Sequence, residues 1–352
     1  MPIPSTLAHR LRHFQSRPSN DHRIVNRSLH LAALLLLSSP LAAQSPIANP
    51  EQPTIAATSH LVIVPTQVRS ANGTPVLSLR TQDFRLTDNG ARQTLLAEPL
   101  DRQPLAIVVL MQTGGSAPRQ FQNYRTFNIL LNVLLTTTPN LKIARAPHKV
   151  ALVTFDSRLR EIWNFPPRID GLKHAFAHPE GGDSGAAVLD ALDCGLALVE
   201  QQPPMYRRIV LLLSQSRDNG SQADAGRLVR RLAASNTTVY SLSFAHRSGK
   251  PGRAPGTLEE AAQALRENPA TEAAALSGGE FSPLNQEEDM ERALSLLATD
   301  FANTYLLSFH PSSEQTGLHM LQVQLSGKSA HLGVKARALY WISSPAREEA
   351  ER

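Results

Sequence analysis

The sequence predicts an α/β protein: a doubly wound, mostly parallel sheet with helices on both faces, flanked by small N- and C-terminal β modules. Between residues 104 and 309, near-continuous apolar runs alternate with amphipathic helical stretches. A parallel sheet covered on both faces requires this alternation, because its strands are buried on both sides. Before and after this region, shorter runs alternate apolar and polar residues, which is typical of strands with one exposed face.

Residues 1–43 are predicted to be a signal peptide. Five arginines and one aspartate lie in the first 27 residues, followed by the apolar stretch "LHLAALLLL" and the small residues "SSPLAAQ". This order is typical of a secretory signal, here cleaved after Ala43. The apolar stretch is shorter than the roughly 20 residues that a membrane-spanning helix needs. We therefore expect an exported protein, periplasmic or extracellular, with no stable membrane span after cleavage.

The chain that follows the leader is nearly neutral. The full sequence has 35 Lys and Arg against 30 Asp and Glu, and the arginine-rich leader accounts for most of this difference. No basic stripe interleaved with aromatic residues remains, so we expect no nucleic-acid partner. Cys194 is the only cysteine. An intramolecular disulfide is therefore impossible, and a packed core must supply the stability.

The segments that follow the leader differ in pattern. Residues 44–58 have several prolines and no periodicity, so we expect a linker. Residues 59–100 are predicted to form a β module, because Asn72-Gly73 and Asn89-Gly90 each separate two short apolar runs. Asn-Gly in this position is a strong hairpin signal, since both turn residues must adopt positive φ.

Residues 101–303 contain the predicted sheet and its helices. The strands are expected near residues 105–111, 149–155, 208–214 and 237–244, and the helices near 118–136, 186–200, 222–234, 257–276 and 286–302. Ligands of such folds bind at the carboxyl ends of the strands. Residues 304–342 return to alternation and residues 343–352 are polar, so we expect C-terminal β-strands and a disordered tail.

Four segments in this order resemble a known family. They are "PLAIVVLMQTGGSA", "KVALVTFDSRLREIWNF", "GGDSGAAVLDAL" and "RRIVLLLSQSRDNGS". Together they resemble the von Willebrand factor type A (VWA) domain. More narrowly, the chain is similar to the exported VWFA-related proteins common in acidobacteria, in which similar short β segments precede and follow the domain. The resemblance covers residues 58–342.

The resemblance implies a degenerate metal-ion-dependent adhesion site. The first-strand motif of the family is Asp-x-Ser-x-Ser, and its positions fall on Gln112, Gly114 and Ser116. The family's later Thr falls on Ala186, and its later Asp falls on Gln215. Because a divalent cation such as Mg²⁺ needs carboxylate ligands to offset its dehydration, two amides in their place predict a metal-free site. We therefore expect neither a metal nor another cofactor.

The same loops are predicted to form the binding surface, whether or not a metal is present. Asp183 and Asp218 are the nearby acids that can replace missing ligands; the alternative is that they make loop hydrogen bonds, Asp218 in its Asp-Asn-Gly turn and Asp183 near the start of a helix. A shift in the alignment offers Ser184 in place of Ala186. The predicted binding residues are Gln112, Thr113, Ser116, Asp183, Ser184, Gln215 and Asp218.

The turn after the first central strand, residues 112–118, can also be interpreted without the family resemblance. It lacks the spacing and the lysine of a phosphate-binding loop, and it lacks the last glycine of a Gly-x-Ser-x-Gly nucleophile elbow. Two glycines can simply give a tight strand-to-helix turn, with Ser116 capping the helix and Pro118 in its first turn. His174 and His178 lie four apart but have no third ligand nearby in the sequence, so we expect no metal site there. Cys194 is expected to pack as a small hydrophobic residue.

These observations favour an exported, non-enzymatic VWA-type module that binds a protein or a cell-envelope component without a metal. A serine hydrolase using Ser116 is the alternative from another functional class. A purely structural envelope protein is the second alternative.

Overall fold

The computed structural model describes residues 61–96, 103–136, 147–244, 255–313 and 315–343. The predicted signal peptide, the predicted linker and all of the predicted tail except its first residue lie outside these ranges. Within the described ranges, no helix combines the length and the apolar character needed to cross a membrane.

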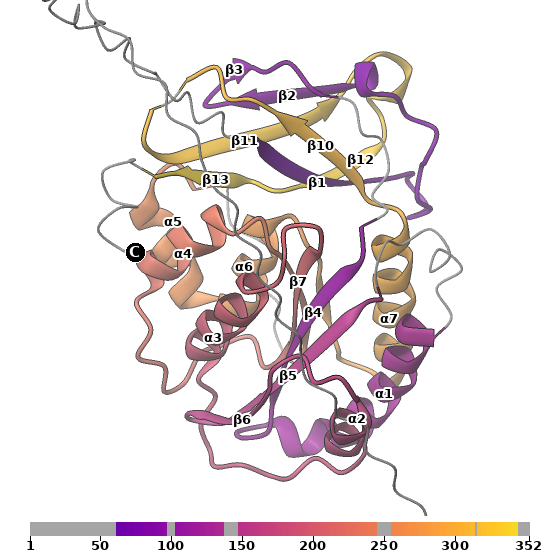
Figure 1. Ribbon diagram of the computed structural model, residues 1–352, viewed down its shortest axis with the longest axis vertical. Coiled ribbons are helices and arrows are strands. Elements are labelled where there is room, and N and C mark those ends of the chain that lie inside the picture. The colour runs from indigo at the N-terminus through magenta and orange to yellow at the C-terminus, as the bar shows by residue number, and fades with distance from the viewer. Residues whose placement is uncertain (1–60, 97–102, 137–146, 245–254, 314, 344–352) are drawn as a thin grey trace, which may run out of the picture. The chain divides into compact units, whose positions relative to one another are not determined.

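A six-stranded sheet forms the centre of the structure, in the order β6-β5-β4-β7-β8-β9. All neighbours are parallel except β5 and β6, which pair antiparallel at one edge. This topology confirms the predicted mostly parallel sheet (Figure 1). Its strands are β4 (Leu105–Gln112), β5 (Lys149–Phe155), β6 (Leu159–Trp163), β7 (Arg207–Ser214), β8 (Thr238–Ser243) and β9 (Phe281–Pro283).

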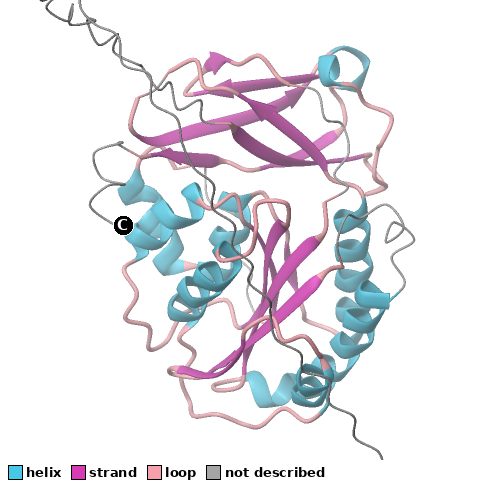
Figure 2. Ribbon diagram, viewed as in Figure 1, coloured by secondary structure: helices cyan, strands magenta, loops and turns pink. Residues whose placement is uncertain are grey.

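Helices cover both faces of this sheet, as the sequence predicts (Figures 1 and 2). One face carries α1 (Phe121–Thr136), α2 (Asp170–Ala177) and α7 (Glu287–Ala302), and the other carries α3 (Val188–Glu200), α4 (Ala225–Ala234), α5 (Leu258–Glu267) and α6 (Pro269–Ser277). Alternate residues of β4 enter two different cores: Val108 packs with α3 and α4, and Val109 packs with α1 and α7. All eight residues of β4 are buried, which explains its continuous apolar sequence.

Three elements were not predicted, and one predicted helix is divided. The edge strands β6 and β9 are short and β6 is polar, so neither has the apolar run of a central strand. The third element is α2, a helix of eight residues. The expected helix at 257–276 is two helices, because Pro269 cannot continue α5 and the residue before it, Asn268, leaves helical geometry with ψ of 67°.

The two predicted β modules are parts of one module, because strands from the N-terminal segment pair with strands from the C-terminal segment. One sheet has the order β10-β1-β12 and the other β13-β11-β2-β3, all antiparallel. The strands are β1 (Val62–Arg69), β2 (Phe84–Asp88), β3 (Ala91–Arg92), β10 (Tyr305–Phe309), β11 (Gly317–Leu325), β12 (Gly333–Ala336) and β13 (Leu339–Ile342), with short 3₁₀ helices at Thr81–Asp83 and Gly327–Ser329. A further 3₁₀ helix, Ala117–Gln120, follows β4 in the α/β domain.

The Asn-Gly turns behave as predicted to different extents. Asn89 and Gly90 have φ of 46° and 84° and join β2 to β3 in a tight hairpin. Gly73 also has positive φ, at 82°, but the chain after it makes only an isolated bridge from Pro75 to Arg69. The Asn72-Gly73 turn therefore reverses the chain without continuing into a regular strand.

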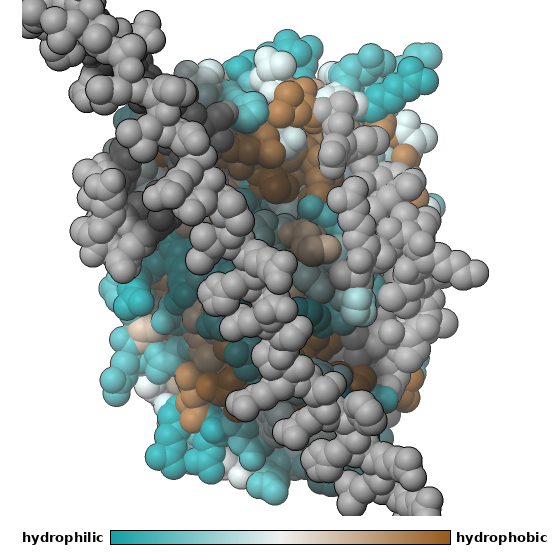
Figure 3. All heavy atoms as spheres, in the orientation of Figure 1, coloured by the Kyte–Doolittle hydropathy of each residue, from teal (hydrophilic) through white to brown (hydrophobic). Residues whose placement is uncertain are grey.

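Large exposed hydrophobic side chains are spread over several elements of the described structure. They are Leu61, Leu77, Leu96, Ile129, Ile162 and Met205. On the face seen in Figure 3, hydrophobic groups are separated by hydrophilic residues. This distribution is ordinary for a protein surface.

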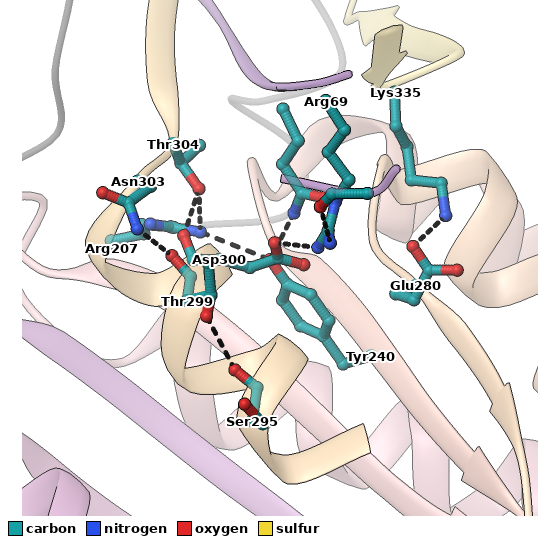
Figure 4. A network of polar contacts seen from close by, with 12 residues as sticks. Arg69, Arg207, Tyr240, Glu280, Ser295, Thr299, Asp300, Asn303, Thr304 and Lys335 are labelled. Atoms are coloured by element: carbon teal, nitrogen blue, oxygen red, sulfur yellow. Dashed lines mark hydrogen bonds and ion pairs between the residues drawn. The ribbon is translucent and has the colours of Figure 1, made fainter. Parts of the chain in front are cut away.

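A buried polar network joins the β module to the α/β domain (Figure 4). Asp300 on α7 forms an ion pair with Arg69 on β1. The Tyr240 hydroxyl on β8 accepts hydrogen bonds from Gln67 Nε2 at 2.8 Å and from Arg207 at 3.4 Å. Within the described residues, Asp300 Oδ2 is buried without a hydrogen-bond partner. Burial therefore raises the pKa of Asp300 to about 6, although the positive charge of Arg69 opposes the shift.

This raised pKa predicts a pH-dependent term in stability. Since the folded state binds the proton of Asp300 more tightly than the unfolded chain does, its contribution is complete below about pH 4 and is lost as the pH rises through about 6. A shift of this size corresponds to roughly 3 kcal/mol. Asp300→Asn should remove that loss from urea-unfolding free energies measured between pH 4 and 7.

Asp289→Asn is the matched control and should leave the pH slope between pH 4 and 7 unchanged, because the pKa of Asp289 is shifted in the opposite direction. Backbone hydrogen bonds from Asn285 and Gln286 lower the pKa of Asp289, so its contribution is present above about pH 4 and is lost as the pH falls. Equal pH slopes for the natural protein and Asp300→Asn would contradict the prediction.

Candidate functional site

The loops at the carboxyl end of the central sheet bring the predicted site residues together. We call residues 112–117, 156–158, 181–187 and 215–221 the carboxyl-end loops. They follow β4, β5, α2 and β7. Backbone hydrogen bonds connect them: Gly115 N donates to Asp183 O at 2.7 Å, and Ala187 N donates to Asp156 O at 2.6 Å. The site is therefore one hydrogen-bonded structure made of four separate chain segments.

Two glutamines lie where the family resemblance places metal-binding carboxylates. Gln112 Oε1 accepts a hydrogen bond from Gln215 N at 2.8 Å, and Gln112 Nε2 donates to Gly114 O at 2.9 Å and to Gln215 Oε1 at 3.2 Å. The Ser116 hydroxyl also donates to Gln215 Oε1, at 3.2 Å. Gln112 is fully buried. Gln215 Nε2 donates to Arg217 O at 3.0 Å, so the donors and acceptors of both amides have partners within the loops.

The backbone of these loops leaves no space for the hydroxyl that the family motif has at position 114. A Cβ atom on Gly114 would lie 2.6 Å from each of three atoms: Asp156 Cβ, Asp183 O and Gly185 O. Two of these are backbone carbonyl oxygens, which cannot move away as a flexible side chain can. Gly114 is thus required by close packing between loops, and a serine does not fit there.

The two nearby acids, Asp183 and Asp218, are occupied by hydrogen bonds within the loops. Asp183 accepts from the Ser157 hydroxyl, from Ser157 N and from Gly185 N. The hydrogen bond from the Ser157 hydroxyl is the main cause that lowers the pKa of Asp183, followed by that from Gly185 N.

Asp218 accepts from Ser221 and, at 3.0 Å, from Leu189 N at the start of α3. The loop role expected for both acids is present, but it is Asp218 that lies at the start of a helix. Within the described residues, no group of three or more His, Cys, Asp or Glu side chains is arranged to hold a metal ion.

Asp156 is a site residue that sequence reasoning missed. It is 1% exposed, its carboxylate accepts hydrogen bonds from Arg158 N at 3.1 Å and Asp183 N at 3.3 Å, and Arg160 lies 3.3 Å away. It follows β5 directly, at the same edge of the sheet as Gln112 and Gln215. The available signal was an acidic residue immediately after a buried strand. Asp156 lies outside the metal motif, whose positions fall in the other loops.

The structure places the seven predicted binding residues at different depths. Gln112 and Thr113 are buried, Ser116, Gln215 and Asp218 are partly exposed, and Asp183 and Ser184 are exposed. Thr113 is held by its hydroxyl, which donates to Phe155 O at 3.2 Å. The seven residues are thus adjacent, but only five of them reach the surface.

The capping role expected for Ser116 is wrong. Ser116 precedes the 3₁₀ helix Ala117–Gln120, and Pro118 is in its first turn as expected, but the serine side chain makes no capping hydrogen bond. Its hydroxyl donates to the side-chain oxygen of Gln215 instead. An amide oxygen is too weak a base to remove the proton from a serine hydroxyl, so this pair lacks the basic partner that an activated nucleophile needs.

His174 and His178 lie close together at the end of α2, and Cys194 lies in α3. The ring centroids of His174 and His178 are 4.8 Å apart, with His178 directly after the end of α2. Cys194 packs partly buried against the core beneath α3, and burial raises the pKa of its thiol. Cys194 therefore behaves as a packing residue.

Beside the carboxyl-end loops lies a pocket of about 610 Å³ between β6, α2 and the residues that follow α2. Its floor includes Thr113 and Thr154, and its wall includes Trp163, His174 and Gly181. The pocket lies on the α1 and α2 side of the sheet and adjoins the closed glutamine network through Thr113. The pocket therefore lies beside the position at which the family resemblance implies a cation.

The chain has structural likenesses at low sequence identity. No protein-family model matches it, and no curated protein does. It is similar to proximal thread matrix protein 1 from the mussel byssus, with 16% identity and a TM-score of 0.40 over 57% of this chain and 48% of that one. The chain thus spans about half the length of the mussel protein.

It is also similar to the SpRpn10 VWA domain, with 11% identity and a TM-score of 0.38 over 54% and 94% of the two chains. A von Willebrand factor type A protein from Catenulispora acidiphila has 9% identity and a TM-score of 0.40 over 81% and 74%. These are likenesses of fold, and they assign neither a ligand nor an activity to this chain.

The closed network predicts that divalent cations leave stability unchanged. A ligand at 100 times its dissociation constant stabilises a folded protein by about 2.7 kcal/mol, which is easily measured. Thermal unfolding of the natural protein should therefore give the same Tm with millimolar Mg²⁺, with millimolar Mn²⁺ and with EDTA. A Tm that rises with Mg²⁺ and returns with EDTA would contradict this.

The network also predicts that a buried negative charge at position 112 is destabilising. Gln112→Glu keeps the shape of the side chain but replaces both N–H donors with an oxygen that faces Gly114 O and Gln215 Oε1. We expect a loss of about 2–4 kcal/mol in the free energy of urea unfolding. Gln324→Glu, the same change at an exposed position of β11, is the control and should have almost no effect. An equal effect of both changes would sink the argument.

Proposed function

We propose that this chain is an exported binding module that recognises a protein or a cell-envelope component through its carboxyl-end loops, without a metal. The observation that carries the proposal is the closed hydrogen-bond network of Gln112, Gln215 and Ser116. It fixes the shape of the loops through neutral groups. A preformed surface loses little conformational freedom on binding, which favours recognition.

The proposed contact surface consists of the exposed and partly exposed members of the predicted set. Asp183 and Ser184 are exposed, and Ser116, Gln215 and Asp218 are partly exposed. Gln112 and Thr113 support the surface from below, because both are buried. The carboxyl ends of the strands are where ligands of doubly wound sheets meet the protein, and this surface stands there.

The proposal excludes catalysis at Ser116. Its hydroxyl is hydrogen-bonded to an amide, and the neighbouring polar groups are other amides and backbone. A nucleophilic serine needs a base in that position. A hydrolase screen with model esters and peptides tests this, with Ser116→Ala as the control; activity that disappears in Ser116→Ala would overturn the non-enzymatic assignment.

The surface is tested by affinity capture from native envelope extracts. Ser184→Arg adds a long charged side chain at an exposed position whose hydroxyl has no hydrogen bond within the described structure, so it should block binding while leaving the fold intact. Ser313→Arg is the matched control, because Ser313 is also exposed but lies between β10 and β11 in the β module.

We expect the natural protein and Ser313→Arg to capture the same specific component, with and without EDTA. We expect Ser184→Arg to lose at least about 90% of it, as a loss of 1.4 kcal/mol or more implies. Full capture by Ser184→Arg would exclude this surface. Capture that EDTA abolishes would exclude metal-independent binding.

A further inference from the structure

The pocket between β6 and α2 has the chemistry of a small-molecule site. Its volume of about 610 Å³ falls within the range of roughly 300–1,000 Å³ that is typical of ligand pockets. It opens at the carboxyl end of the sheet, where ligands of this fold class bind. The backbone of Gly181 and Gly182 forms part of its rim, so a ligand can approach the main chain closely.

The pocket wall combines a flat aromatic ring with charged groups of both signs. Trp163 packs against the core beneath α1 and α2 and also lines the pocket. The charged wall residues are Arg158, Arg160, Glu161 and Glu180, so their formal charges cancel. Thr113 and Thr154 add hydroxyls at the floor.

Several of these polar groups are available to a ligand, whereas the Thr113 hydroxyl donates to Phe155 O and the Thr154 hydroxyl accepts from Glu161 N. Arg160 is engaged with Asp156 at 3.3 Å. Within the described residues, the side chains of Arg158, Glu161, Glu180 and the His174–His178 pair make no hydrogen bond or salt bridge. Donors and acceptors thus stand unpaired around one aromatic wall.

We propose that this pocket binds a neutral saccharide unit. A pyranose ring has an apolar C–H face, which suits a tryptophan wall, and a rim of hydroxyls, each of which both donates and accepts hydrogen bonds. Such a ligand requires donors such as Arg158 together with acceptors such as Glu161. Because the formal charges of the wall cancel, the pocket as a whole favours neither a net-negative nor a net-positive ligand.

The two tryptophans of the chain make the proposal measurable. Trp163 lines the pocket, whereas Trp341 is on β13 in the β module, and Figure 1 shows β6 and β13 well apart from each other. In a Trp341→Phe background, Trp163 is the only source of tryptophan fluorescence. We expect its emission to shift and saturate on titration with neutral disaccharides: cellobiose, maltose, lactose and N,N′-diacetylchitobiose.

Two variants test the walls of the pocket. Gly181→Phe should abolish the titration, because a Cβ at Gly181 has nothing within 4 Å and the residue has no positive φ, so the added ring enters open space without backbone strain. Glu161→Gln should weaken the best disaccharide by about tenfold, since it replaces a charged hydrogen-bond acceptor with a neutral one. Arg168→Ala is the control; Arg168 lies between β6 and α2, is 87% exposed and is absent from the pocket wall.

Charged and peptide probes separate this proposal from its competitors. Glucuronic acid, glucosamine and the blocked dipeptide N-acetyl-Ala-Glu-amide are titrated in the same way. The proposal holds if a neutral disaccharide binds at least about tenfold more tightly than all three probes and Gly181→Phe removes that binding. It is overturned if no neutral disaccharide changes Trp163 emission, if a charged or peptide probe binds best, or if Gly181→Phe binds normally.

The proposed function and the saccharide site can be tested independently of each other. Ser184 does not line the pocket, so Ser184→Arg should block partner capture and leave saccharide titration unchanged. Glu161→Gln should weaken saccharide titration and leave partner capture unchanged, because Glu161 lines the pocket but lies outside the carboxyl-end loops.

Discussion

The carboxyl-end loops depend on the burial of the central strand. Strand β4 is buried on both faces and ends in Gln112, a polar residue with no exposed surface. Buried polar groups must find protein partners, because they have lost those of water. Gln112 finds them in the loop after β7 and in its own turn, and Tyr124 donates to its carbonyl at 2.7 Å. The close approach of the loops, with glycine at position 114, follows from this requirement.

An amide and a carboxylate of similar shape have opposite consequences at this position. A carboxylate only accepts, so it needs cations or donors around it; an amide both donates and accepts, so two amides can satisfy each other. Here Gln112 Nε2 donates to Gln215 Oε1 at 3.2 Å, and Gln112 Oε1 accepts from the backbone N of Gln215 at 2.8 Å. The two amides therefore brace the loops from within, through neutral groups. The acids that remain nearby, Asp156, Asp183 and Asp218, each accept backbone N–H groups and hold loops in place.

Sequence patterns predicted the fold better than the site. Apolar runs located β4, β5, β7 and β8, because strands buried on both faces must be apolar throughout. The polar edge strand β6 has no such pattern, and its position is set by antiparallel pairing with β5. The family resemblance pointed to Gln112 and Gln215, which the structure brings into contact. It did not find Asp156 or the space limit at Gly114, because both depend on how loops far apart in sequence pack. The pairing of the two flanking segments has the same cause, since register between distant strands is not written in either strand alone.

The interleaved β module also has a consequence for the order in which the chain folds. Strand β1 has β10 and β12 as neighbours, with Val62 opposite Phe309 and Val68 opposite Val334. During synthesis, β1 therefore has neither of these partners until β10 and β12 have been made, and contacts so distant in sequence form slowly. The α/β domain between them can collapse earlier, because its strands and helices alternate locally. Meanwhile both hydrogen-bonding edges of β1 are open to pairing with other chains. A polypeptide that terminates before β10 and β12 lacks only a small segment, but β1 then stays open to such pairing.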